Sequence, residues 1–214
     1  ADFRHWGTRY VGNPDLDPET SQTYDLGFDL FRGPLTFKAG YFHTDFEDKI
    51  MRQSFLDSGV ETVSFTNGGD AEIDGFEFGL EWDAAATLEL PFGASFWSNM
   101  TVNTTMDDEE TGEDLTYISD YEVKSGINLS HGNLGAQLAH VLVGPQQVDN
   151  YDSYPYTTSE LGSFNYWDLT LRCKIAGSWE VKASVLNLFD QEVEWVRGYL
   201  MPERNYRIGL TYTF

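Results

Sequence analysis

Residues 167–185 read WDLTLRCKIAGSWEVKASV and decide the fold. Apolar and polar side chains alternate on both sides of Ala176-Gly177-Ser178, and a short run of small residues around glycine is typical of a tight turn. Alternation with a period of two places successive side chains on opposite faces of a β-strand. The stretch therefore predicts a hairpin with one apolar face and one polar, charged face.

The same alternation repeats along the chain in segments of about ten residues. We expect about nine strands, at residues 24–30, 35–42, 75–82, 88–96, 121–129, 134–138, 167–174, 179–185 and 206–214. Their connections alternate between short, near residues 32–34, 83–86, 131–133 and 176–178, and long, over residues 47–71, 105–117, 147–163 and 189–204. Short turns at one end and long loops at the other are typical of outer-membrane barrels. We therefore predict an all-β fold, an antiparallel transmembrane β-barrel.

The two faces help to separate a barrel from a soluble sandwich, whose strands would alternate in the same way. Charges of both signs recur on the polar face, as a wet barrel interior requires; they are Glu77, Glu81, Lys124, Arg172, Lys174, Lys182 and Arg207. Aromatic residues gather near strand ends, where interfacial girdles lie; they are Tyr41, Trp82, Tyr121, Trp167, Trp179 and Tyr206. Both features favour the barrel. A passive porin and a secreted β-rich binding module, such as a lectin, stay open as alternatives.

The composition excludes several classes of protein. The formal net charge is −22, from 35 acidic and 13 basic residues, which argues against nucleic acid as a partner because phosphate binding needs a basic patch. Cys173 is the one cysteine in the sequence, so an internal disulfide framework and a cysteine-based zinc site are excluded. Residues 1–30 show no signal-peptide pattern. No apolar run approaches the roughly 20 residues of a membrane helix, so any membrane crossing must use strands.

Three motifs carry a resemblance to a known family. Residues 13–21 read NPDLDPETS, residues 67–77 read NGGDAEIDGFE, and residues 185–190 read VLNLFD. The third motif is followed by Pro202-Glu203-Arg204 and by a final Tyr212-Thr213-Phe214. In this order and at this spacing the motifs resemble those of the TonB-dependent receptors, over nearly the whole chain.

The resemblance implies that residues 1–214 are the C-terminal strands of a 22-stranded barrel, with the plug domain and the earlier strands missing. It implies a bacterial outer-membrane receptor that captures a scarce large nutrient at extracellular loops and imports it with TonB energy. The implied partners are outer-membrane lipid, the missing plug and strands, the TonB complex acting through that missing part, and the barrel-assembly machinery. Among family members the pattern is nearest to cobalamin and siderophore receptors, so a corrinoid and an iron or other metal chelate both stay open as ligands.

Aromatic and cationic residues in the long connections are the candidate ligand-binding residues. They offer flat apolar faces beside positive charges, which can hold a rigid ligand by stacking and cation–π contact. The candidates are Tyr151, Tyr154, Tyr156, Trp195, Arg197, Tyr199 and Arg204. Packing within the loops or in an interfacial girdle would explain several of them equally well.

The end of the chain carries a different signal. Tyr212 and Phe214 close a strand that alternates from residue 206 onward, and this resembles the C-terminal strand that the barrel-assembly machinery recognises by β-augmentation. The alternative is an ordinary last strand that ends on an aromatic residue by chance.

Metal and catalytic chemistry find little support. Asp107, Asp108, Glu109 and Glu110 begin an acidic run that could hold calcium through carboxylate oxygens, although such runs are usually solvated loop tips. His5, His43, His131 and His140 show no metal-ligand spacing. We find no nucleophile with a nearby base, so we predict neither an enzyme nor a cofactor.

Overall fold

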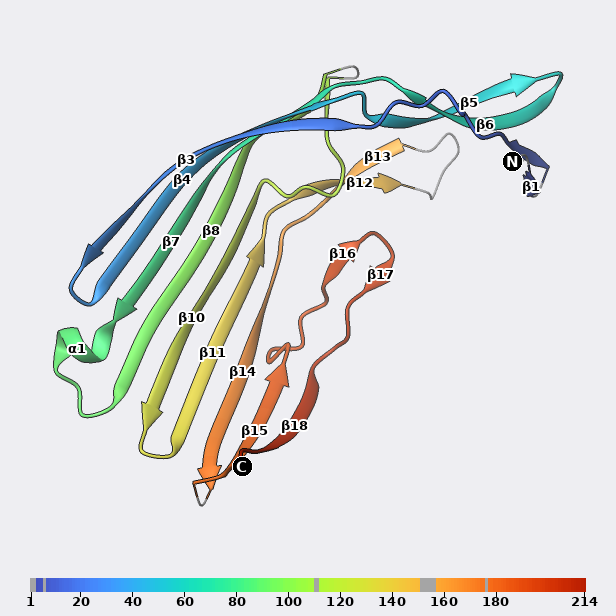
Figure 1. Ribbon diagram of the computed structural model, residues 1–214. Helices are drawn as coiled ribbons and strands as arrows, with labels where there is room; N and C mark the ends of the chain where they lie inside the picture. The colour runs from blue at the N-terminus through green and yellow to red at the C-terminus, as the bar shows by residue number, and fades with distance from the viewer. Residues whose placement is uncertain (1–2, 6, 110–111, 151–156, 176) are drawn as a thin grey trace. The chain divides into compact units, whose positions relative to one another are not determined.

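The computed structural model describes residues 3–5, 7–109, 112–150, 157–175 and 177–214, and their regular secondary structure is almost entirely β-strand (Figure 1). Contacts between Cα atoms divide the chain into two compact units. Unit 1 is formed from residues within 1–25, 42–74 and 105–115, and unit 2 from residues within 26–41, 75–104 and 116–214. Four long strands begin in one unit and end in the other.

The main sheet has ten strands among the described residues. They are β3 (Thr20–Arg32), β4 (Leu35–Glu47), β7 (Ala71–Asp83), β8 (Gly93–Asp108), β9 (Glu113–Asp114), β10 (Tyr121–His131), β11 (Leu134–Val143), β14 (Phe164–Ile175), β15 (Trp179–Leu186) and β18 (Asn205–Tyr212). Their order is β18-β15-β14-β11-β10-β8-β7-β4-β3, with β9 paired to β8. All nine segments predicted from the alternation contribute to this sheet.

The register of unit 2 gathers the alternating side chains into two continuous faces. One row runs across five strands through apolar residues, from Ile127 to Leu138, Leu169, Val185 and Tyr206. The next row, one residue along, is polar, from Asn128 to Gln137, Thr170, Ser184 and Arg207. A shift of one residue in any pair would mix the faces, so the side-chain pattern fixes the register.

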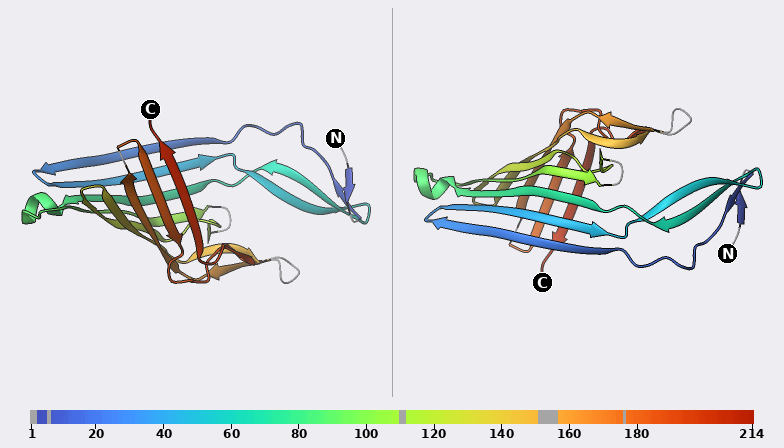
Figure 2. Two further views of the ribbon diagram at one scale, coloured as in Figure 1. Left: turned by 90° about the horizontal axis from the view of Figure 1, so that it is seen from below. Right: turned by 90° about the horizontal axis from the view of Figure 1, so that it is seen from above.

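The apolar face of unit 2 is open to its surroundings. Leu26 is 76% exposed and Ile208 is 85% exposed, where a soluble sheet would cover such side chains with a second layer. Figure 2 shows that the unit 2 sheet is strongly coiled, so that β15 and β18 run at a steep angle to the unit 2 part of β3. Coiling of this kind follows from the right-handed twist of strands and is the curvature that a closing barrel needs.

A short helix corrects the prediction between residues 83 and 96. The strand predicted from residue 88 begins only at Gly93, because Ala84–Leu88 form the helix α1. Asp83 caps this helix, since its Oδ1 accepts a hydrogen bond from the Ala86 backbone N–H at 2.9 Å. In the described part of the chain, no helix is both long and apolar enough to cross a membrane.

The long connections contain hairpins that the alternation did not predict. They are β5 (Ile50–Asp57) with β6 (Val60–Asn67), β12 (Gln146–Asn150) with β13 (Thr157–Leu161), and β16 (Glu194–Val196) with β17 (Tyr199–Leu200). In the first hairpin, Ser58 and Gly59 both have positive φ angles, of 52° and 81°. Two such residues make a type I′ turn, which matches the twist of a hairpin.

Unit 1 contains a small sheet of its own. Its order is β1-β2-β6-β5, where β1 is Phe3–His5 and β2 is Thr8–Tyr10. β2 pairs in parallel with β6, and β5 pairs antiparallel with β6. Val63 of β6 is 1% exposed and belongs to the small core of this unit.

The buried apolar residues of unit 2 lie where its loops meet the strands. Val143 and Val148 are fully buried and Val193 is 3% exposed, whereas the middle of the sheet has apolar side chains that stay exposed. A soluble domain would place its core against the middle of its sheet. This distribution of buried and exposed apolar residues is therefore that of a sheet whose apolar face contacts an apolar medium such as lipid.

Candidate functional site

The first two sequence motifs hold each other in unit 1. The side-chain amide of Asn67 donates to the carbonyl oxygens of Asp17 and Asp48, at 2.9 and 2.8 Å, and its Oδ1 accepts from the Asp17 N–H at 2.7 Å. Glu19 accepts the backbone N–H of Ile50 at 2.7 Å. These bonds tie the segment before β3 to the base of the β5–β6 hairpin, so both motifs serve to position a loop.

The third motif forms a similar set of hydrogen bonds at the base of a loop in unit 2. Asn187 adopts a positive φ of 52°, and its backbone N–H donates to Asp168 Oδ1 at 2.9 Å. Its side chain exchanges two hydrogen bonds with the backbone of Gln191, at 2.7 and 2.9 Å. Asparagine tolerates this backbone conformation better than most residues and can close the turn with its amide.

A second contact fastens the far end of the same connection. Asp190 accepts the backbone N–H of Arg204 at 2.8 Å and faces its guanidinium at 3.4 Å. These interactions, the backbone N–H first, lower the pKa of the Asp190 carboxyl below its usual range. Residues 187–204 are thus a loop with a fixed base that carries the β16–β17 hairpin.

Two loop hairpins of unit 2 contact each other above this base. The Gln146 amide at the start of β12 donates to the carbonyl oxygen of Trp195 at 2.9 Å. The Trp195 ring meets Phe164 edge-on, with ring centroids 4.9 Å apart. The Tyr117 hydroxyl also donates to Asp149 Oδ2 in β12 at 3.3 Å, and desolvation of the partly exposed phenol raises the pKa of this tyrosine. The loops therefore form one packed layer.

The structure shows the contacts of four of the predicted ligand-binding residues. Trp195 and Arg204 are engaged in loop packing and in the Asp190 ion pair, so their contacts fit the structural alternative. Arg197 donates to the Ser159 hydroxyl at 3.0 Å, and Tyr199 stands 73% exposed at the tip of the β16–β17 hairpin. The remaining candidates, Tyr151, Tyr154 and Tyr156, lie outside the described residues.

A cavity of about 200 Å³ opens on the polar face of unit 2, directly below the β16–β17 loop. Charges of opposite sign line it from the strands, Asp168 on β14 and Arg207 on β18. Tyr166 adds a phenol, and Val193 and Met201 add apolar surface from the loop. A few polar groups beside apolar walls are what a pocket needs to orient part of a ligand. Sequence analysis placed Arg207 on the charged face but missed this pocket, because the loop residues that close it are distant in sequence.

The comparison with known families decides the identity of this fold. A family model described as "TonB dependent receptor-like, beta-barrel" matches residues 4–188. The chain belongs to this family. TonB-dependent receptors are β-barrels of the bacterial outer membrane, and this confirms the predicted fold class and location.

Solved structures of TonB-dependent receptors share the fold. The siderophore receptor PirA from Acinetobacter baumannii is 21% identical, with a TM-score of 0.76, and the match covers 96% of this chain and 33% of that one. A variant of the ferric enterobactin receptor from Pseudomonas aeruginosa is also 21% identical, with a TM-score of 0.79 and coverage of 96% and 32%. The copper transporter OprC is 17% identical, with a TM-score of 0.75 and coverage of 94% and 32%. The chain thus spans about a third of the length of these receptors.

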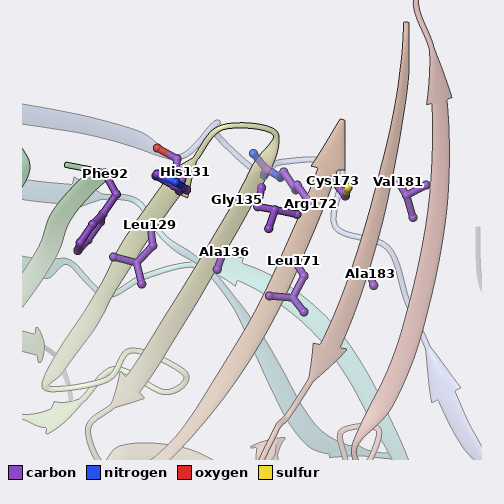
Figure 3. A pocket seen from close by; sticks show the side chains of 12 residues that line it. Phe92, Leu129, His131, Gly135, Ala136, Leu171, Arg172, Cys173, Val181 and Ala183 are labelled. Carbon is purple, nitrogen blue, oxygen red and sulfur yellow. The ribbon is translucent and has the colours of Figure 1, made fainter. Parts of the chain in front are cut away.

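The barrel explains an apolar hollow in unit 2. The hollow has a volume of about 460 Å³, and its lining includes Leu129, Ala136, Leu171 and Ala183 from four neighbouring strands, which Figure 3 labels. Cys173 lies at its edge beside Val181. These residues belong to the apolar face, which points away from the lumen of an outer-membrane barrel. The hollow is therefore separate from the polar cavity that Asp168 and Arg207 line.

Two further groups of predicted residues can be located. Tyr212 ends β18 and packs its ring on Trp179, with centroids 4.7 Å apart, while Phe214 beyond it is fully exposed. In the acidic run, Asp107 faces Asp114 and Asp108 faces Glu113 across β8 and β9. Lys49 forms an ion pair with Asp108. Glu109 donates its backbone N–H to Asp70, and Glu110 lies outside the described residues.

Proposed function

We propose that this chain is the C-terminal part of an outer-membrane receptor that binds a metal chelate at its extracellular loops and imports it with energy from the TonB complex. Family membership supports the receptor class. The similar structures support the ligand class, since they include receptors for siderophores and a copper transporter. The proposed activity is binding and transport, without a catalytic step or a cofactor.

The observation that carries the proposal is the cavity on the polar face. Asp168, Arg207 and Tyr166 place charges and a phenol where the strands meet the loop layer. Its volume of about 200 Å³ is smaller than the roughly 300–1,000 Å³ of a complete small-molecule site. The cavity would therefore hold one group of a larger ligand, and exposed loop residues such as Tyr199 would contact the rest.

The open sheet supports a larger molecule. Within the described residues, β3 and β18 are the two outer strands of the main sheet. Strand edges in lipid need partners because no water is present to satisfy their backbone groups. We propose that further strands close the barrel, that a plug fills its polar interior, and that the exposed apolar face contacts outer-membrane lipid. Insertion by the barrel-assembly machinery, with recognition of Tyr212 and Phe214, is part of the same proposal.

The first experiment is a binding titration of the full-length receptor, purified from outer membranes in detergent. Ferric enterobactin, cobalamin and Cu²⁺ are the probes, and tryptophan fluorescence is the signal. Saturable binding of one chelate, together with uptake by cells that stops when TonB is deleted, is the expected result. Uptake of small solutes that does not depend on TonB would indicate a porin, and recovery of the protein only in the soluble fraction would indicate a secreted binding module.

A matched pair of variants tests the location of the site. Tyr199 and Tyr206 are both 73% exposed, but the first is on the β16–β17 hairpin and the second is on the apolar face. Loss of an aromatic contact costs about 1–2 kcal/mol, so Tyr199→Ala should weaken binding of the successful probe roughly five- to thirty-fold. Tyr206→Ala should leave the dissociation constant unchanged. Equal changes in the dissociation constant for the two substitutions would show that the β16–β17 loop is not part of the ligand-binding site.

A further inference from the structure

Side chains from two neighbouring strands converge on one point in unit 1. His43 on β4 directs Nδ1 toward Oδ1 of Asp74 at 2.9 Å and Oε1 of Glu72 at 3.6 Å, both on β7. One ligand atom from each of these three residues lies within 4.8 Å of the others. The side chains are half-buried, with 25%, 13% and 34% of the surfaces of His43, Asp74 and Glu72 exposed. The three donors are thus gathered before any ion is bound.

The spacing of these atoms fits a small divalent cation. Zinc binds histidine nitrogen and carboxylate oxygen at about 2.0–2.2 Å in a tetrahedron, whose neighbouring ligand atoms are then roughly 3.3–3.5 Å apart. The distances of 2.9 and 3.6 Å from His43 Nδ1 to the two carboxylates lie on either side of that separation. Small rotations of the side chains would complete three corners of the tetrahedron, with water for the fourth.

A fourth residue holds the imidazole from its other side. His43 Nε2 lies 3.0 Å from Oδ2 of Asp45. In metal sites the second ring nitrogen of a histidine ligand commonly donates to a carboxylate, which fixes the ring and makes the ligating nitrogen more basic. The Tyr24 ring stacks near the imidazole, with centroids 6.1 Å apart and planes at 28°, so it also restricts the orientation of the ring.

The charge of the cluster favours a cation over a simple ion pair. One imidazolium beside the carboxylates of Asp45, Glu72 and Asp74 would leave two negative charges uncompensated among half-buried side chains. Like charges so close together are destabilising, and a divalent ion bound to the neutral imidazole would reduce the excess from two negative charges to one. Imidazole is a good ligand for zinc, whereas calcium and magnesium prefer sites made of oxygen alone. The donor set therefore favours zinc over calcium and magnesium.

We propose that His43, Glu72 and Asp74 bind one Zn²⁺ ion, with Asp45 as the positioning residue for the imidazole. The ligands come from the end of β4 and the start of β7, which are neighbours in the sheet and flank the β5–β6 hairpin in the sequence. The ion would clamp the base of that hairpin. It would be a resident ion of the receptor, independent of the transported ligand.

The test uses the full-length receptor in detergent, stripped with a chelator and then titrated calorimetrically with ZnCl₂. We expect one additional Zn²⁺ per chain in wild type compared with His43→Gln, counted by elemental analysis. His43→Gln and Asp74→Asn should each weaken binding at least about ten-fold, and Asp45→Asn roughly ten- to a hundred-fold, as for a residue behind a ligand. His131→Gln, which changes a histidine at the end of β10, is the matched control and should bind as wild type does.

Several results would overturn the proposal. They are zinc affinity unchanged in both His43→Gln and Asp74→Asn, no zinc binding by wild type up to millimolar concentration, and displacement of zinc by equimolar calcium. Asp74→Asn keeps the size and shape of its side chain, so it separates loss of the ligand from disruption of the fold. Since the titration is read without any transported ligand, its outcome is independent of whether the receptor imports a metal chelate.

Discussion

Replacing Leu171 by arginine tests whether the apolar face of unit 2 faces the bilayer. Leu171 is 49% exposed, and its cross-strand neighbours, Ala136 and Ala183, are too small to shield a new charge. It lies four residues before the end of β14 at Ile175. At about 3.3 Å per residue on a strand tilted by about 40°, that places it roughly 10 Å deep in an apolar band about 25 Å tall.

Arginine on the lipid face near the midplane costs about 2–4 kcal/mol. This lowers the ratio of folded to unfolded protein roughly 30- to 700-fold. Thr170→Arg is the control, because Thr170 belongs to the polar face, and it sacrifices only the hydrogen bond with Ser184 at 3.0 Å, worth about 1 kcal/mol. Urea titration of the full-length receptor in lipid vesicles gives the free energy of unfolding of each variant. The folded fraction is read by gel electrophoresis, in which folded protein that has not been heated migrates differently from unfolded protein. A penalty for Thr170→Arg as large as that for Leu171→Arg would show that the two faces have been assigned wrongly.

Two further predictions concern local contacts. A Cβ at Gly126 would lie 2.8 Å from the ring of Trp97, whereas one at Gly209 would meet nothing within 4 Å. Gly126→Ala should therefore shift the tryptophan fluorescence and lower the free energy of unfolding by about 1–3 kcal/mol. Gly209→Ala should change neither quantity. The pKa of Asp190 is lowered in the folded protein, chiefly by the Arg204 N–H. The stabilisation from the hydrogen bond and ion pair between Asp190 and Arg204 is therefore fully present above the usual aspartate pKa of about 4. It is lost as the pH falls through the lowered pKa of Asp190 in the folded protein. Cleavage of this loop by pepsin should begin as the pH falls through that range, and Asp190→Asn should remove the pH dependence.

Local sequence carried enough information for nine of the ten strands that the described residues place in the main sheet, but not for the short strand β9. Alternation along each strand and short turns such as Gly33 and Gly132, both with φ of 57°, act over a few residues, so both could be recognised without knowing the fold. The error at α1 came from the same rule. Leu88 and Leu90 alternate with polar residues, but Asp83 followed by three alanines was a helix start that outweighed the alternation.

The sites could not be predicted in the same way, because they depend on contacts between distant residues. His43 and Asp74 are 31 residues apart, and only the pairing of β4 with β7 brings them together. Sequence reasoning recognised Trp195 and Arg204 as capable of ligand contact, but their hydrogen bonds and ring contacts within the loops are set by tertiary packing. Residue type alone can propose that a side chain binds something, and it cannot say whether the partner is a ligand or a neighbouring loop.

The hairpins inserted between paired strands affect how the loop sequences of such a receptor can change in evolution. β4 pairs with β7 across the β5–β6 insertion, β11 with β14 across β12–β13, and β15 with β18 across β16–β17. The entropy of closing a loop grows only with the logarithm of its length, and doubling the length costs about 0.6 kcal/mol. An insertion can therefore be lengthened or exchanged for a few tenths of a kilocalorie per mole, while the hydrogen-bonded wall beneath it keeps its register. A lineage of receptors can acquire new ligands by replacing loops on an unchanged wall.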